Sequence, residues 1–336
     1  MKHAAIGPIS IHYPDKAESN DDLNRQFPDW GIDLIYSKTG IANRYVAADD
    51  ECSSDLAVKA AEKLFADHDI DRSTIDYVML CTQTPDYPLP TTSCLIQDRL
   101  GLRTDIGAFD FNLGCSGYVY GLSMAEGLIR SGAAKRILFL TAETYTKYID
   151  ATDRSLRTIF SDAAAATLIE AVDEPSVEAF QFGTDGSGGD TLLVAKGGHR
   201  PAEDALKPRH RHRWPSELYM DGPSLISFAV GAIPGVVDEI LKKANLHRED
   251  IELFLMHQAT RKMLNLLQER LELDDEKLPI RLENCGNTVS STIPILIDDM
   301  RKEKKVKKGD NQIMIGFGVG WSWAGCVWRD VLCPTD

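Results

Sequence analysis

The chain has 336 residues, 43% of them hydrophobic and 26% charged, proportions typical of a globular protein with a sizeable core. Its net charge of -14 excludes the broad basic surface of a nucleic-acid-binding protein. The seven cysteines form no Cys-x-x-Cys pair, so neither a disulfide framework nor a zinc site is indicated. We therefore expect a reducing, cytoplasmic environment.

The N-terminal half begins with elements of α/β type. Residues 1–14 contain a short apolar stretch broken by Pro8, which is too short for a signal peptide and is interpreted as a first strand. Residues 55–68 have the periodicity of an amphipathic helix, and residues 75–84 form a continuous apolar strand that contains Cys81. No run approaches the roughly 20 apolar residues of a membrane span, so we expect no membrane association.

The phrase NLGCSG, at residues 112–117, is the first that indicates chemistry. Cys115 precedes a stretch of helical periodicity at residues 117–132, and a helix start presents unpaired N–H groups that favour a thiolate. Residues 136–144 then form another continuous apolar strand. Cys115 is a candidate nucleophile, although a free cysteine is more often a buried structural residue.

The C-terminal half repeats this order. An amphipathic helix is predicted from Pro234 to Asn245, followed by an apolar strand at residues 251–260 that contains His257. The phrase NCGNTV, at residues 284–289, echoes NLGCSG and places Asn287 where the first copy has Cys115. A further apolar strand is predicted over residues 312–320.

The repeat predicts two similar α/β halves packed face to face, which we place at residues 1–172 and 173–336. Strands that are apolar on both faces and alternate with helices indicate mostly parallel sheets covered on both sides. If a pseudo-two-fold axis relates the halves, one cleft collects Cys115, His257 and Asn287. Chance similarity between short apolar strands is the alternative.

Besides Cys115, His257 and Asn287 are candidates for a chemical role. His257 follows a strand, and strand ends face ligand crevices in open α/β sheets, although a lone histidine is more often structural. The amide N–H of Asn287 can stabilise an enolate or thioester oxygen, whereas the alternative role is a helix N-cap.

Several polar or glycine-rich stretches carry weaker signals. The run GFGVG, at residues 316–320, would bring backbone N–H groups close to a ligand, and GTDGSGG, at residues 183–189, is interpreted as a surface turn. Two basic stretches, at residues 207–213 and 301–308, are either solvated faces or docking sites for an acidic carrier or a phosphate. No metal, flavin or nicotinamide site is visible, and we expect no cofactor.

Five segments together resemble the 3-oxoacyl-[acyl-carrier-protein] synthase III family of the thiolase superfamily. The resemblance runs over nearly the whole chain, and its specific segments are DFNLGCSGYVYGL, TDRSLRTIFSDAAAA, MHQATRKM, CGNTVSSTIP and FGVGWSWAG. The resemblance implies a thiolase-like fold with a layered αβαβα architecture and a homodimer. It also implies that Cys115, His257 and Asn287 are the catalytic residues.

The resemblance implies a decarboxylating Claisen condensation. Cys115 would take an acyl group from a thioester of coenzyme A or of an acyl carrier protein. His257 and Asn287 would hold a malonyl thioester as carbon dioxide leaves. Backbone N–H groups of Cys115 and of the turn near Val319 would bind the oxyanion, and Phe317 matches the aromatic residue that helps to expel the carboxylate.

Four positions assigned to substrate binding include departures from the family pattern. Leu34 stands where the family has an adenine-stacking Trp, whereas its partner Arg is kept as Arg154. Thr260 replaces the Asn of the family's His-Gln-Ala-Asn motif, and Leu89 stands where many relatives place a Phe that lines the neighbouring subunit's acyl pocket. These changes favour a carrier-bound or unusual acyl donor, in fatty-acid initiation or in a specialised pathway such as polyketide synthesis.

Two alternatives to condensation stay open. The first is an acyltransferase that moves the acyl group from Cys115 to an oxygen or nitrogen nucleophile, a reaction that gives Asn287 no enolate to stabilise. The second is a non-catalytic subunit that shapes the tunnel of a heterodimer, which the joint presence of Cys115, His257 and Asn287 disfavours.

Overall fold

The computed structural model describes residues 1–200 and 216–332. Its strands are β1 (His3–His12), β2 (Lys16–Ser19), β3 (Asn43–Val46), β4 (Tyr77–Cys81), β5 (Gly107–Phe111), β6 (Arg136–Glu143), β7 (Ala163–Val172), β8 (Val177–Thr184), β9 (Leu192–Val194), β10 (Leu218–Met220), β11 (Ile251–Met256), β12 (Asn311–Gly318) and β13 (Ser322–Arg329). Its α-helices are α1 (Asn20–Gln26), α2 (Ile32–Thr39), α3 (Ser53–Asp67), α4 (Thr92–Arg99), α5 (Gly117–Arg130), α6 (Arg154–Arg157), α7 (Gly222–Ala244), α8 (Arg261–Leu271) and α9 (Thr292–Lys302). Short 3₁₀ helices include η1 (Pro28–Trp30), η3 (Tyr145–Tyr148) and η7 (Val289–Ser291).

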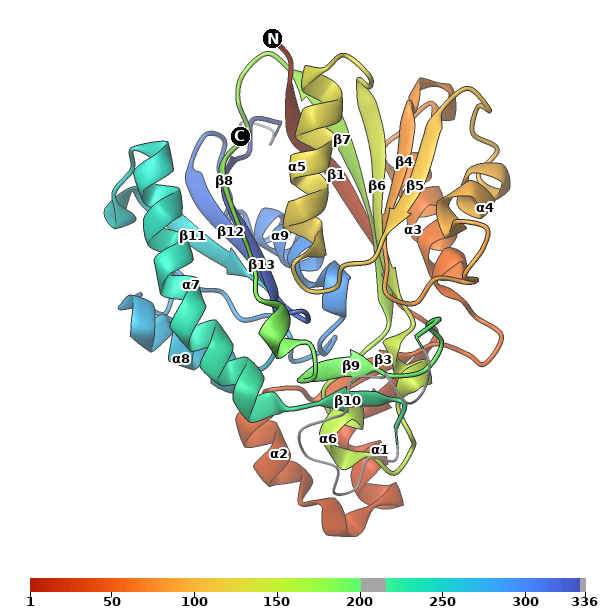
Figure 1. Ribbon diagram of the computed structural model, residues 1–336, viewed down its shortest axis with the longest axis vertical. Helices are drawn as coiled ribbons and strands as arrows, with labels where there is room; N and C mark the ends of the chain where they lie inside the picture. The colour runs from red at the N-terminus through yellow and green to blue at the C-terminus, as the bar shows by residue number, and fades with distance from the viewer. Residues whose placement is uncertain (201–215, 333–336) are drawn as a thin grey trace.

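Five layers make up the molecule (Figure 1). One sheet has the strand order β1-β7-β6-β4-β5 and the other has the order β11-β12-β13-β8. Helices α5 and α9 lie between the sheets and contact both of them, whereas α3 covers the outer face of the first sheet and α7 that of the second. The thiolase-like αβαβα architecture and the two pseudo-symmetric halves are therefore confirmed.

The strand orders show how the repeat is built. Taken from the inner edge of each sheet, β1, β7, β6 and β4 correspond to β8, β13, β12 and β11. A counterpart of β5 is missing among the described strands: the chain beside β11, at residues 277–282, includes Pro279, which has no N–H to donate to a ladder.

The prediction of mostly parallel sheets is wrong in part. Parallel pairing joins β4 to both β5 and β6, and joins β11 to β12. The pairs β6–β7, β1–β7, β12–β13 and β8–β13 are antiparallel. The reason is local for β12 and β13, because only three residues separate them, and a connection this short closes a hairpin rather than a crossover. Both kinds of strand are apolar on both faces, so hydrophobicity alone does not distinguish them.

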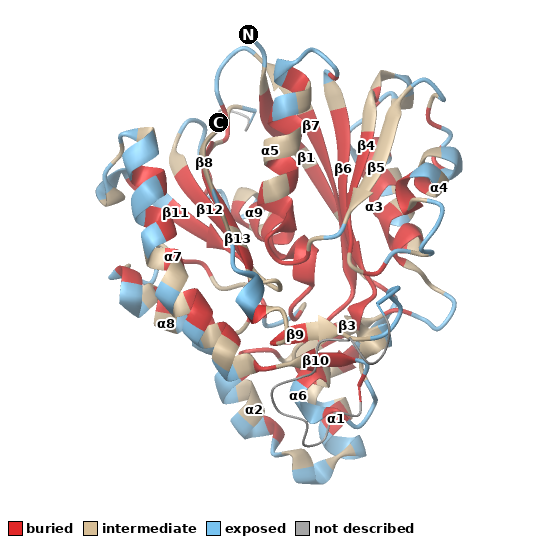
Figure 2. Ribbon diagram, viewed as in Figure 1, coloured by how far each residue is buried: buried red, intermediate tan, exposed pale blue. Residues whose placement is uncertain are grey.

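Burial follows the layers, as Figure 2 shows by the red inner strands and helices. One core cluster lies between the sheets around α5 and α9, a second lies under α3, and a third lies under α7 and α8. Cys115 belongs to the third cluster, although it precedes the central helix α5. The functional cavity therefore opens on the side of the molecule that carries α7 and α8.

Helix α7 begins 12 residues earlier than the sequence predicts, at Gly222 instead of Pro234. Its N-cap is Asp221, whose side chain accepts a hydrogen bond from Ser224 N, and Pro223 stands in the first turn. Pro234 lies inside the helix. The prediction took this proline for a start because proline favours the first turn of a helix and disfavours its interior.

The same helix is long and apolar enough to cross a membrane by length and composition, with a mean hydropathy of 1.6 over 18 residues. The sequence analysis missed this run because glycines and prolines interrupt it. In the fold, α7 packs one face on β8, β12 and β13, and another side on α8. Its apolar character is accounted for by that packing and by the cavity described below.

Candidate active site

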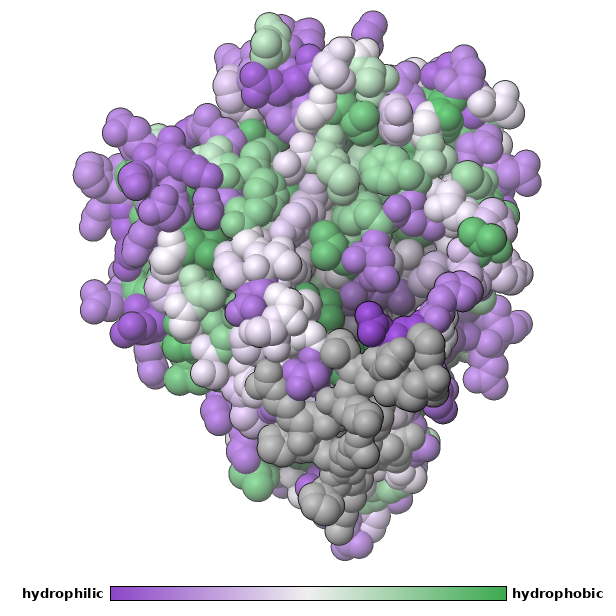
Figure 3. Space-filling model, viewed as in Figure 1, coloured by the Kyte–Doolittle hydropathy of each residue, from purple (hydrophilic) through white to green (hydrophobic). Residues whose placement is uncertain are grey.

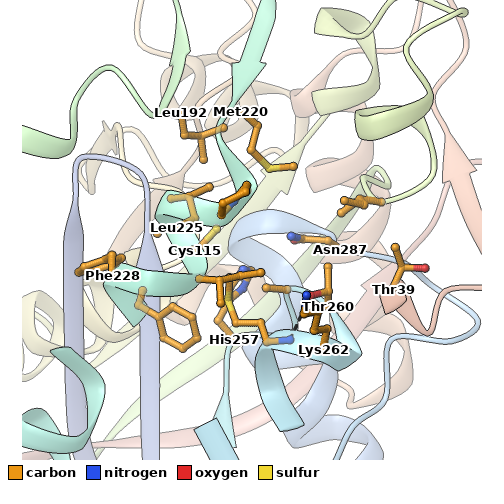
Figure 4. A pocket seen from close by; sticks show the side chains of 18 of the residues that line it. Thr39, Cys115, Leu192, Met220, Leu225, Phe228, His257, Thr260, Lys262 and Asn287 are labelled. Carbon is orange, nitrogen blue, oxygen red and sulfur yellow. Dashed lines mark hydrogen bonds between the residues drawn. The ribbon is translucent and has the colours of Figure 1, made fainter. Parts of the chain in front are cut away.

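Cys115, His257 and Asn287 line one cavity of about 570 Å³, although they come from three distant segments (Figure 4). Phe317, Gly318 and Thr260 also line it. The remaining wall is largely apolar and comes mainly from α7, α8 and the segment after α6; it includes Ile159, Phe160, Leu192, Met220, Leu225, Phe228, Met263 and Leu266. Figure 4 shows the three polar side chains facing the same space between these apolar ones.

Cys115 lies in the short connection between β5 and α5, one residue before the N-cap Ser116. It is buried, with 8% of its surface exposed. Burial, together with the nearby Glu143 carboxylate, raises the pKa of the Cys115 thiol to about 12. The helix start predicted a lowered thiol pKa, whereas burial and Glu143 together raise it.

The hairpin between β12 and β13 passes directly against Cys115. A Cβ atom added to Gly318 would lie 2.9 Å from Cys115 Cβ and 3.1 Å from its Sγ, and one added to Gly316 would lie 2.5 Å from the Cys115 carbonyl oxygen. Two glycines of the GFGVG run are therefore needed for close approach to the nucleophile's backbone. Val319 turns away from this cavity and lines a second one.

His257 follows β11 directly and is 2% exposed. Its Nδ1 lies 2.7 Å from Thr292 Oγ1, and the Thr292 hydroxyl lies 3.2 Å from the carbonyl oxygen of Val289. When that hydroxyl donates to Val289, Nδ1–H donates to Thr292, which leaves Nε2 as an unprotonated acceptor. Burial lowers the pKa of His257 to about 3, so the ring is neutral at physiological pH.

Phe317 supports the histidine from the side. Its ring meets the His257 ring edge to face, with ring centroids 5.7 Å apart and an interplanar angle of 86°. The next motif residue, Gln258, is a structural group: its Nε2 donates to the Met256 carbonyl, and its Oε1 accepts from Arg281 N at 2.8 Å. These contacts fix the end of β11 and hence the position of His257.

Asn287 is held by the other half of the chain. Its N–H donates to the Ile159 carbonyl at 2.9 Å, and its own carbonyl accepts from Ser161 N at 3.0 Å. Its side-chain Oδ1 accepts from Val289 N at 2.9 Å. Within residues 1–200 and 216–332, Asn287 Nδ2 has no hydrogen-bond acceptor, which leaves it as a donor at the cavity.

The prediction that Asn287 stands at a helix start, as Cys115 does, is wrong. Asn287 stands before η7, and α9 begins only at Thr292, so Asn287 is not the N-cap of that helix. The Asn287 side chain still caps a backbone N–H locally, because its Oδ1 accepts from Val289 N and closes a turn. Asn287 and Cys115 therefore occupy corresponding places in the order of the two repeats, but they do not occupy the same position relative to a helix.

A buried carboxyl group links the two halves behind the cavity. Glu143 accepts hydrogen bonds from Ser290 Oγ at 2.8 Å and from Thr84 Oγ1 at 3.1 Å, as well as from Gln83 N. Burial raises the pKa of Glu143 to about 8. It ties the segment after β4 to the segment that carries Asn287, and thereby fixes the spacing between the two sides of the site.

The residues assigned to substrate binding fall in different places. Thr260 lines the cavity and caps α8, because its Oγ1 accepts from Met263 N at 3.3 Å. Leu34 and Leu89 are 64% and 86% exposed and do not line the cavity of the single chain. Arg154 is also outside it, and its Nη1 donates to the carbonyl of Trp30 at 3.4 Å.

Sequence reasoning missed several residues of this site. Lys38 and Lys262 line the cavity from α2 and α8, and the first turns of α7 supply Leu225 and Phe228. The signal for the α7 residues was Asp221-Gly222-Pro223, a helix start. Thr292 carried no recognisable signal, because a hydroxyl contact to a residue 35 positions away requires the fold.

The remaining polar stretches are separate from the cavity. Residues 207–213 lie outside the described residues. Residues 301–308 begin in the last turn of α9, where Arg301 pairs with Asp330 and donates to the carbonyls of Ile6 and Gly7. Of residues 183–189, the first two belong to β8 and the rest form a turn. No three His, Cys, Asp or Glu side chains in the described part of the chain could hold a metal ion.

Comparison with known proteins gives a consistent result. Two family models match, "3-Oxoacyl-[acyl-carrier-protein (ACP)] synthase III" over residues 109–186 and the C-terminal model of the same name over residues 241–330. A beta-ketoacyl-[acyl-carrier-protein] synthase III of Clostridioides difficile is 34% identical over 96% of this chain and 97% of its own length.

Solved structures agree with these relatives over the whole chain. A crystal structure of a 3-oxoacyl-(acyl-carrier-protein) synthase III is 42% identical, with a TM-score of 0.91, and the match covers 97% of this chain and 99% of that one. The priming beta-ketosynthase of the R1128 polyketide biosynthetic pathway is 27% identical, with a TM-score of 0.86, covering 99% and 98%.

Proposed function

The chain belongs to the 3-oxoacyl-[acyl-carrier-protein] synthase III family, and we propose that it condenses an acyl thioester with a malonyl thioester and releases carbon dioxide. The observation that carries the proposal is the cavity that contains Cys115, His257 and Asn287 together. A thiol nucleophile, a ring nitrogen and an amide donor are the groups that this two-stage reaction needs.

The first stage is acyl transfer to Cys115. The thiol is protonated at neutral pH, so a base must take its proton as Sγ attacks the thioester carbonyl. His257 Nε2, left as an acceptor by the Thr292 contact, is that base. A bond forms between Sγ and the acyl carbon, the carbon–sulfur bond of the donor breaks, and the proton leaves with the departing thiol.

The second stage is decarboxylation of the malonyl thioester. Loss of carbon dioxide leaves electrons on the thioester oxygen, and the Nδ2–H of Asn287 is the donor that stabilises this enolate. His257 serves as a second donor in its other tautomer, in which the ring proton has moved from Nδ1 to Nε2 and the Thr292 hydroxyl has rotated to donate to Nδ1. The ring of Phe317 covers the histidine and keeps this side of the cavity dry.

The carbanion then attacks the acyl carbon on Cys115 and the bond from that carbon to Sγ breaks, which gives a 3-oxoacyl thioester and a Cys115 thiolate that takes up a proton from water. We assign the oxyanion that forms to backbone N–H groups of Cys115 and of the turn near Val319, which the close approach of Gly318 to Cys115 supports. Lys38 and Lys262, both cationic, would meet the phosphate that a coenzyme A or carrier-protein thioester carries.

A homodimer is part of the proposal. Strand β5 lies at the edge of its sheet with all five residues only half-buried, and an uncovered edge invites pairing with another chain. Hydrophobic side chains gather over α5 and its neighbours in Figure 3. Among the aromatic side chains, Phe109 and Phe111 of β5 are half-buried and Phe182 of β8 is 37% exposed. Light scattering at micromolar concentration should give twice the 37.2 kDa chain mass, and a monomer would contradict the dimer.

The test of the reaction separates its two stages. We expect Asn287→Ala to be acylated at Cys115 but to decarboxylate malonyl thioester about 100- to 1000-fold more slowly, because the variant lacks an enolate donor. Acylation is measured by intact-protein mass and decarboxylation by release of labelled carbon dioxide, with Cys115→Ala as the control for acylation. Decarboxylation at the unchanged rate would remove Asn287 from this role and would favour an acyltransferase.

A further inference from the structure

A second cavity, of about 470 Å³, adjoins the first. Leu192 lines both cavities, and the β12–β13 turn separates them, with Gly318 on the first and Val319 on the second. The second cavity also reaches the Cys115 connection through Asn112. The second cavity is therefore next to the connection that carries Cys115 and is distinct from the apolar one, which Cys115 itself lines.

The wall of this second cavity is more polar than that of the first. Tyr145 Oη donates a hydrogen bond to Gln83 Oε1 at 2.9 Å, and Tyr148 Oη lies 3.4 Å from the Gln83 carbonyl oxygen. Gln83 packs next to the nucleophile, since a Cβ atom on Gly114 would lie 2.4 Å from its Oε1. The Gln83–Tyr145 pair is thus held beside Gly114, the residue that precedes Cys115.

Gln83 and Tyr145 can each form a further hydrogen bond with a ligand. In the part of the chain that the structure describes, Gln83 Nε2 has no acceptor, and the amide of Asn112 has no partner. The Tyr145 oxygen donates its proton to Gln83 and still has lone pairs. A ligand hydroxyl matches both groups, because it accepts from Gln83 Nε2 and donates to the Tyr145 oxygen.

We propose that Cys115 accepts an acyl group that carries a hydroxyl close to its thioester carbonyl, and that Gln83 and Tyr145 bind this hydroxyl. The inference rests on the proposed function, since it names the acyl donor of that reaction. The transfer itself is unchanged: the carbonyl carbon moves from the donor sulfur to Cys115 Sγ, and the thiol proton leaves with the donor thiol. A plain alkyl chain of the same length would leave the Gln83 amide unpaired, which disfavours it.

The experiment compares two donors that differ by one oxygen atom. Butyryl and 3-hydroxybutyryl thioesters of N-acetylcysteamine, the latter as separate enantiomers, carry neither a nucleotide nor a carrier protein, so docking elsewhere does not affect the ratio. Intact-protein mass over time gives the rate of acylation at Cys115. We expect one hydroxyacyl enantiomer to react at least about tenfold faster than butyryl at limiting donor concentration.

Variants assign the preference to residues. Gln83→Met and Tyr145→Phe keep side-chain volume, and each should bring the hydroxyacyl-to-butyryl ratio towards one, whatever the absolute rates. Gln181→Met, on β8 and outside both cavities, is the matched control and should keep the wild-type ratio.

Each outcome decides one of the two claims. Cys115 acylation at equal rates from both donors, or faster from butyryl, would overturn the hydroxyacyl inference and leave the condensing function standing. A ratio that survives in Gln83→Met and Tyr145→Phe would also overturn it. An adduct that forms equally in Cys115→Ala, or none from any thioester, would overturn the proposed function and the inference with it.

Discussion

At the residue scale, burial and a neighbouring carboxyl group raise the pKa of the Cys115 thiol. The type of nucleophile was predictable from the phrase Asn-x-Gly-Cys and from its repeat, but the state of its thiol was not. The thiol pKa depends on how closely the β12–β13 hairpin covers the side chain and on Glu143, which is 28 positions away. Neither contact is visible in the local sequence.

The raised thiol pKa predicts how Cys115 reacts with iodoacetamide. Because the pKa of about 12 lies above the working range, the thiolate fraction, and hence the alkylation rate, should rise about tenfold per pH unit between pH 6 and 9. Mass spectrometry of the alkylated Cys115 peptide measures this rate. A rate that is flat near neutral pH would show a thiolate paired with protonated His257 and would contradict the neutral pair described above.

Thr292 is the positioning residue for His257 that sequence reasoning missed. Thr292→Val keeps the shape of the side chain but removes the oxygen that meets Nδ1 at 2.7 Å. We expect it to lower both acylation and decarboxylation by about 10- to 100-fold, because a buried ring N–H loses its acceptor.

Thr292→Ser is the matched control, since it restores the hydroxyl, and it should recover most of both rates. The pH dependence of acylation should also shift in Thr292→Val but not in Thr292→Ser. Equal loss in both variants would mean that packing, and not the hydroxyl, is what the position supplies.

At the scale of elements, apolar runs and helical periodicity were enough to place most of the layers. The helices α3 and α5 and the strands β6 and β12 begin within about two residues of their predicted positions. The errors have physical causes: a proline inside α7 looked like a helix start, and apolar strands gave no sign of whether they pair parallel or antiparallel. Because the first turns of α7 line the cavity, this one boundary error removed several site residues from the sequence analysis.

Helix α5 offers a direct test of its packing between the sheets. Gly121 faces the first sheet, where an added Cβ would lie 2.1 Å from the ring of Phe139, whereas Gly127 meets nothing within 4 Å. We expect Gly121→Ala to lower the free energy of unfolding by about 1–3 kcal/mol through overpacking. Gly127→Ala should raise it by about 0.5–1 kcal/mol, because alanine is the better helix former.

Urea denaturation of both variants measures these changes, and each variant controls for the other because they share one helix. If both substitutions raised the stability, the close contact between α5 and β6 would be contradicted.

At the scale of the whole molecule, the repeat was the most informative feature of the sequence. It predicted two layered halves and one cleft between distant segments, since equivalent strand ends and connections must converge if the halves are related. We propose residues 1–172 and 173–336 as those halves, which agrees with β7 ending at Val172 and β8 beginning at Val177. The residues that line the two cavities could not be predicted from the repeat, because the cavity walls combine side chains from many elements.

The central claim is carbon–carbon bond formation with loss of carbon dioxide, and one measurement tests it most directly. The enzyme is incubated with an acyl thioester that acylates Cys115 and with malonyl thioester labelled in its free carboxyl group, and released carbon dioxide and products are quantified. We predict one carbon dioxide per 3-oxoacyl thioester formed, and loss of both in Cys115→Ala. Turnover of the acyl donor to an ester or amide, without release of carbon dioxide, would contradict the account.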